Sequence, residues 1–152
     1  MKQTFLKHWL RGSALGIFCL SFFSLSAQQM IDWPQLAKVT FSYVQNFDQN
    51  FWYGKPKFHP EILALEGKEV VIKGYILPMD ISGESYALSA NPFSTCFFCG
   101  GAGQESVMEL RLKKKKARFE TDQVVTFVGT FRLNDEELEL NYILEEARVY
   151  EP

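Results

Sequence analysis

The chain has 152 residues, of which 47% are hydrophobic and 15% aromatic, with 16 basic and 18 acidic side chains. This length is sufficient for one domain with one core, and the aromatic content favours a compact β structure. The balance of charge excludes the strongly basic composition of nucleic-acid-binding proteins.

The first 27 residues have the order of a secretory signal peptide. Three basic residues precede an apolar run, Ala14 to Phe23, and small residues follow up to Ala27. We expect cleavage near Ala27, export to the periplasm and a single domain over residues 28–152. The apolar run is shorter than the roughly 18 residues that a membrane anchor needs, so no membrane span is expected after cleavage.

Cleavage would also change the charge of the protein. It removes three basic residues and no acidic one, which leaves 13 basic against 18 acidic residues and a net charge of −5. An acidic protein of this kind is a poor partner for nucleic acid or for an anionic membrane.

The first part of the expected domain predicts short elements. Asp32 is placed to cap a short helix, and alternation of apolar and polar residues begins at Val39 as in a strand. The aromatic stretch 51–58 is interpreted as a strand or loop that covers one mouth of the core. His59 precedes a proline and can open a second short helix.

Five further strands are predicted from β-branched or alternating residues: 69–77, 85–89, 107–112, 124–133 and 138–149. Gly74 and Gly129 interrupt the two long strands, and the alternation slips at Glu145, which indicates bends or bulges. The pattern predicts an all-β protein with one or two short helices, built as a small OB-like Greek-key barrel of about five strands. A different small barrel or an open sandwich is the competing architecture.

The chemically distinctive segment is CFFCGGAG, residues 96–103. After cleavage, Cys96 and Cys99 are the only cysteines, and three interpretations stay open. A disulfide suits the oxidising compartment, although a loop of four residues adds only about 2 kcal/mol. Thiol–disulfide exchange would need a helix after the pair to lower the thiol pKa, and none is indicated.

The third interpretation is a metal site. Two thiolates separated by two residues can bind one soft ion, zinc first and copper second, and Gly100 frees the backbone to wrap around the sulfurs. His59 or Glu105 would complete the site, with Asp80 or a second chain as further sources of ligands.

Other features have simpler interpretations. The lysine run 113–116 falls where a strand should end, so a solvated turn is favoured over a nucleic-acid stripe. No Ser/His/Asp arrangement, phosphate loop or acid–base carboxylate pair is found, which predicts a non-enzymatic protein. Five aromatic residues could line a groove, but packing in the core or a lid is favoured for them. These residues are Trp33, Trp52, Tyr53, Phe97 and Phe98.

Four stretches, LEGKEVVIKGYILPMD, YALSANP, CFFCGGAGQESVMEL and NYILEEA, resemble a family of exported Gram-negative bacterial proteins that is described only as a domain of unknown function. The family pattern often has proline where this chain has Gln104. The resemblance implies an OB-like periplasmic barrel associated with transport or metal homeostasis, with an envelope protein or transporter component as partner. It carries over only Cys96 and Cys99 as a candidate site, with Gly100 as their structural companion.

We therefore predict a periplasmic, non-enzymatic accessory protein that binds a soft metal, with zinc favoured. The alternative is a protein-binding module of the cell envelope that contains a Cys96–Cys99 disulfide. A thiol–disulfide redox protein is the third possibility.

Overall fold

The computed structural model describes residues 28–48, 50–80, 82, 85–114, 117–137 and 139–151. The predicted signal peptide, residues 1–27, lies outside these residues, so its cleavage stays a prediction. Within the described chain, the two α-helices span four residues each, and no helix is long and apolar enough to cross a membrane.

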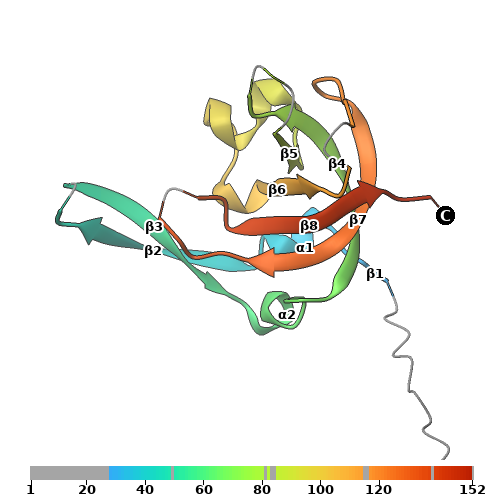
Figure 1. The fold of residues 1–152 in the computed structure, drawn as a ribbon. Coiled ribbons are helices and arrows are strands. Elements are labelled where there is room, and N and C mark those ends of the chain that lie inside the picture. The colour runs from blue at the N-terminus through green and yellow to red at the C-terminus, as the bar shows by residue number, and fades with distance from the viewer. Residues whose placement is uncertain are drawn as a thin grey trace, which may run out of the picture.

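Five strands close into a barrel (Figure 1): β4 (Glu69–Pro78), β5 (Tyr86–Ser89), β6 (Val107–Leu112), β7 (Val124–Leu133) and β8 (Tyr142–Val149). The order around the barrel is β4–β5–β6–β8–β7, and β7 pairs with β4 to close it. All pairs are antiparallel except β6–β8. The predicted fold class, a small Greek-key barrel of the OB type, is therefore confirmed. A short strand, β1 (Gln29–Met30), pairs with β4 from outside this circuit.

The long strand β4 serves two neighbours, which explains its central glycine. It pairs with β7 up to Tyr75 and with β5 from Tyr75 onward. Near this change of partner, a Cβ on Gly74 would lie 2.6 Å from the carbonyl oxygen of Ser89 and 2.8 Å from the Leu88 side chain. The predicted tight bend is present, and it depends on glycine because the neighbouring strand leaves no room for a side chain.

The β7–β8 pair contains the bulge that the slip in alternation predicted. The register shifts between Val128 and Thr130, on either side of Gly129. On the opposite strand Glu146 has a φ of 51°, a left-handed conformation that is uncommon outside glycine. A Cβ on Gly129 would lie 2.6 Å from the carbonyl oxygen of Glu145.

Two short helices cover the core. In α1 (Trp33–Leu36), the Asp32 side chain accepts a hydrogen bond from the backbone N–H of Gln35 at 2.9 Å, so the predicted cap is confirmed. The second helix, α2 (Pro60–Leu63), begins directly after His59, as predicted. Both helices contribute one fully buried side chain to the core, Leu36 and Ile62.

The remaining strands, β2 (Val39–Asn46) and β3 (Phe51–Phe58), form a separate antiparallel hairpin that projects well beyond the barrel (Figure 1). Only its base packs against the core, through Val39 and Phe58. The expectation that residues 51–58 cover a mouth of the core therefore holds for Phe58 alone.

The space around two glycines yields a test of this fold. We expect Gly74→Ala to lower the free energy of unfolding by about 1–3 kcal/mol, because the new Cβ overlaps the Ser89 backbone. Gly54→Ala in the hairpin is the matched control, since its Cβ would only touch Phe41 at 3.4 Å. Urea unfolding of both variants measures the difference, and equal stabilities would contradict the proposed bend.

Candidate functional site

The cysteine segment lies between β5 and β6 and consists of three 3₁₀ turns, η1 (Phe93–Thr95), η2 (Phe97–Cys99) and η3 (Gln104–Ser106). The backbone N–H groups of Cys99 and Gly101 both donate to the carbonyl oxygen of Cys96, at 3.2 and 3.1 Å. Gly100 has a φ of 73°, the left-handed conformation that lets the chain turn after the second cysteine. These hydrogen bonds and the conformation of Gly100 close the chain into a tight turn around Cys96.

The two cysteines differ in their surroundings. Cys96 is fully buried in a small apolar cluster with Leu77, Ala87 and Val107, which lie on the outer side of β4, β5 and β6. Cys99 is exposed. The turn is therefore fixed to the barrel by one cysteine and presents the other to solvent.

Both cysteines are free, and the Cys99 thiol interacts electrostatically with Cys96 across the turn. Partial desolvation, followed by this interaction, raises the pKa of the Cys99 thiol above its ordinary value. A raised pKa opposes a role as redox nucleophile, which needs a thiolate at neutral pH. The closeness of the two thiols is compatible with a shared metal ion or with a disulfide.

The other predicted ligands lie elsewhere or do not complete a cluster. His59 caps α2, where its Nδ1 accepts from the N–H of Glu61 at 3.4 Å and lies 3.9 Å from the Glu61 carboxylate. Glu105 belongs to η3, and its charge acts on buried Tyr142, whose pKa is raised mainly by desolvation. Among the described residues, no three His, Cys, Asp or Glu side chains form a group that could hold a metal ion. The structure thus brings Cys96 and Cys99 together and adds neither His59 nor Glu105 to them.

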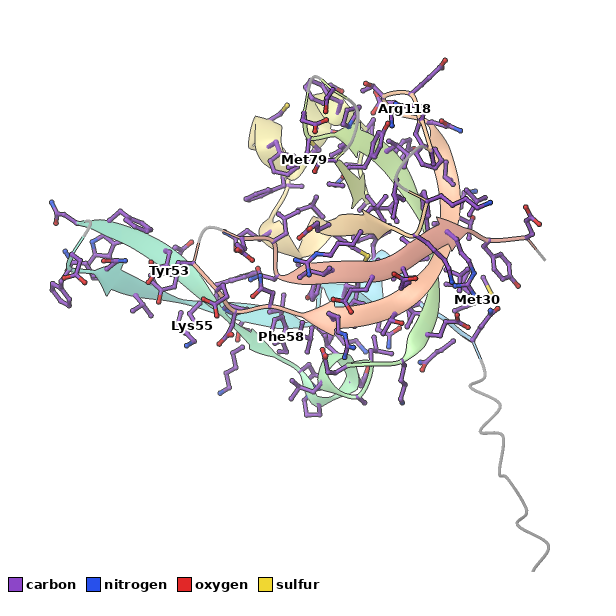
Figure 2. All side chains as sticks on the ribbon, in the orientation of Figure 1. Met30, Tyr53, Lys55, Phe58, Met79 and Arg118 are labelled. Carbon is purple, nitrogen blue, oxygen red and sulfur yellow. The ribbon has the colours of Figure 1, made fainter. Side chains whose placement is uncertain are left out.

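A groove of about 410 Å³ lies beside the cysteine turn. It runs between the β2–β3 hairpin, the turn itself and the segment that joins β7 to β8. Figure 2 marks two of its lining residues, Tyr53 on the hairpin and Met79 at the end of β4. Its apolar and aromatic lining residues are Tyr43, Trp52, Tyr53, Met79, Phe97, Phe98 and Leu140.

Four of the five aromatic residues singled out in the sequence reach this groove. The packing interpretation is correct for Trp33, which packs against the core and donates from Nε1 to the carbonyl oxygen of Lys73 at 2.8 Å. It is wrong for Trp52, which is 64% exposed. The lysines Lys113 and Lys114 are exposed just after β6, as the solvated-turn interpretation predicts, while residues 115–116 lie outside the described chain.

Sequence reasoning missed the polar side of the groove. Glu136, Glu139 and Asn141 line it, all from the segment between β7 and β8. In the sequence, the two glutamates of this side belong to an acidic run that follows Asn134. Such a run is easily interpreted as an ordinary solvated turn.

The fold and the site together define the class of protein. It is an OB-type barrel with an added hairpin and a cysteine turn on one outer face. No protein-family model matches the sequence, and a search of curated proteins finds no match.

A crystal structure of a DUF3299 family protein from Pseudomonas aeruginosa PAO1 is similar to this chain, with a TM-score of 0.52 and 18% sequence identity. The match covers 83% of this chain and 98% of that chain. At this identity the likeness establishes the shared fold, and it agrees with the resemblance to a domain of unknown function.

The turn itself can be tested at its two adjacent glycines. A Cβ on Gly101 would lie 2.6 Å from the carbonyl oxygen of Thr95, whereas one on Gly100 would meet nothing within 4 Å. We expect Gly101→Ala to open the turn, so that Cys96 reacts with Ellman's reagent as readily as Cys99 in the reduced native protein. Gly100→Ala, which costs about 1–2 kcal/mol of backbone strain, should keep Cys96 protected. Protection of Cys96 in both variants would refute the described packing.

Proposed function

We propose that this protein is a periplasmic, non-enzymatic accessory protein that binds a soft metal ion, zinc in the first place, through Cys96 and Cys99. The observation that carries the proposal is the tight turn that holds Cys96 and Cys99 three residues apart and anchors Cys96 to the barrel. Paired sulfur donors at this spacing are the ligands that zinc and monovalent copper prefer.

An open site of this kind favours a carrier role over a structural one. A structural zinc is normally enclosed by four protein ligands, and the described residues offer no group of three. Two thiolates would leave coordination positions for water or for donor groups of a partner. The exposed position of Cys99 permits such an approach. An envelope protein or transporter component is the partner class that we propose, in line with the resemblance noted in the sequence.

Native mass spectrometry of the mature protein, purified from periplasm without reductant or chelator, tests the proposal. We expect one zinc per chain with both thiols deprotonated. Cys96→Ser and Cys99→Ser should each weaken binding by more than about 100-fold, since loss of a second-shell partner alone costs 10–100-fold. His59→Ala and Glu105→Gln are the matched controls and should retain the metal, because neither side chain forms a cluster with the thiols. Zinc retained by both serine variants would refute the site.

The thiol chemistry predicts a dependence on pH. Zinc must displace the proton of the Cys99 thiol, so its apparent affinity should rise by up to about tenfold per pH unit below the pKa of that thiol. The pKa of Cys99 is raised, so this thiol stays protonated to higher pH and the rise should continue above neutrality. Competition with a colorimetric chelator between pH 6.5 and 8.5 measures the slope. A flat profile would indicate ligands other than these thiols.

The tight turn that holds the two free thiols also favours a second candidate, a binding module in which a Cys96–Cys99 disulfide shapes the wall of the groove. The same mass measurement separates the two functions. A mass lower by two hydrogens and without metal would support the disulfide module and reject a resting metal site.

A further inference from the structure

The groove beside the cysteine turn has walls held in place by two polar contacts. Asn46 donates to Glu137 at 2.6 Å, and Lys55 lies 3.5 Å from Asp135. Each contact joins the hairpin to the segment between β7 and β8. The opening between these elements is therefore a defined feature of the fold.

The charge of the groove has one sign. Glu136 and Glu139 line it, and among the described residues no lysine, arginine or histidine does. Neither glutamate forms an ion pair with a described residue, although Glu139 accepts a hydrogen bond from the Asn134 amide at 2.8 Å. The charge of Glu139 also acts on Arg111, whose own ion pairs are with Glu109 and Glu145. On the hairpin, the basic residue Lys55 is paired with Asp135. Two carboxylates are thus available to an incoming positive charge.

A second cavity, of about 500 Å³, differs from the groove in the charge of its lining residues. Its lining contains the cations Lys113, Lys114 and Arg148 and one carboxylate, Glu151. Lys113 and Arg148 are paired with Glu146 and Glu69, at 3.7 and 2.7 Å. The charges of that cavity are mainly basic, whereas those of the groove are acidic.

A third observation concerns Asn141, which lines the groove and is 4% exposed. Its amide nitrogen donates to the carbonyl oxygen of Asn134 at 3.3 Å, which fixes the orientation of the amide, because that carbonyl can only accept. Its Oδ1 is buried and has no hydrogen-bond partner among the described residues. A buried acceptor without a donor costs about 1–3 kcal/mol. Because this oxygen is closed off in the structure, a ligand donor recovers that free energy together with a small shift of the Asn141 side chain.

We propose that the groove binds an arginine side chain, presented by an apolar stretch of a partner polypeptide. A guanidinium has five N–H donors in one plane, which suits two carboxylates and one orphan amide oxygen, and its flat face stacks on aromatic rings. Tyr43 and Trp52, which lie on the same face of the hairpin, supply such rings on its wall. The exposed Met79 and Phe98 offer apolar surface to the residues that flank the arginine.

The probe is the blocked tripeptide acetyl-Leu-Arg-Leu-amide, titrated into ¹⁵N-labelled protein and followed by NMR. The indole N–H of Trp52, assigned by its loss in Trp52→Phe, should shift with saturation in the range of about 0.1–1 mM. The indole of Trp33, bonded to the Lys73 carbonyl on the core side, is the internal control and should stay in place. Equal shifts of both indoles, or no shift at millimolar peptide, would overturn the proposal.

Charge is tested on both partners. The same peptide with citrulline, a neutral isostere of arginine, should bind the unchanged protein about tenfold more weakly. The arginine peptide should bind the Glu136→Gln/Glu139→Gln variant about tenfold more weakly as well. Glu120→Gln/Glu151→Gln removes the same charge away from the groove and should bind normally. Equal binding of the citrulline peptide would overturn the proposal, and free arginine that binds as tightly as the peptide would overturn the assignment to a polypeptide.

The result can be judged separately from the metal proposal, because neither Cys96 nor Cys99 lines the groove. Zinc binding without peptide binding rejects only this inference, and the converse rejects only the metal site.

Discussion

The side chain of Tyr142 joins the three parts of this molecule. It is fully buried, its hydroxyl donates to the carbonyl oxygen of Leu36 at 2.7 Å, and its ring packs against Phe58 and Phe131. One residue at the start of β8 therefore links the barrel, helix α1 and the base of the hairpin. Among the described residues the hairpin pairs with no other strand, so its position relative to the barrel, and with it the groove, depends on this contact together with the Asn46–Glu137 and Lys55–Asp135 contacts.

Both candidate sites use the outside of the barrel, while the inside is filled by side chains. The cysteine turn rests on the outer residues of β4, β5 and β6 through Cys96 and its apolar neighbours. Phe97 and Leu140 pack against the same cluster and also line the groove. The anchoring of the thiols and the shape of the groove are thus coupled through one small patch of apolar surface, even though the two sites would bind different ligands.

The sequence patterns predicted those features of the fold that depend on residues close together in the chain. Strands β6 and β7 begin and end where the alternation and β-branched runs indicated, and the bulge near Glu145 follows from a slip visible in the sequence. The closeness of Cys96 and Cys99 followed from their spacing. The groove could not be predicted in this way, because its residues come from five segments. An exposed aromatic such as Trp52 has the same sequence signature as a core residue, and the unpaired oxygen of Asn141 is defined only by its tertiary surroundings.

The projecting hairpin has a consequence for how copies of the protein behave toward one another. A long two-stranded arm with exposed Tyr43, Phe47 and Trp52 offers backbone edges on which a second chain could add a strand. Strand β3 contains the sequence Lys55-Pro56-Lys57, and both lysines are exposed. Proline lacks a backbone donor and the lysines repel an identical strand, so this edge resists ladder formation. The arm can therefore keep its aromatic surface in water without seeding fibrils along β3.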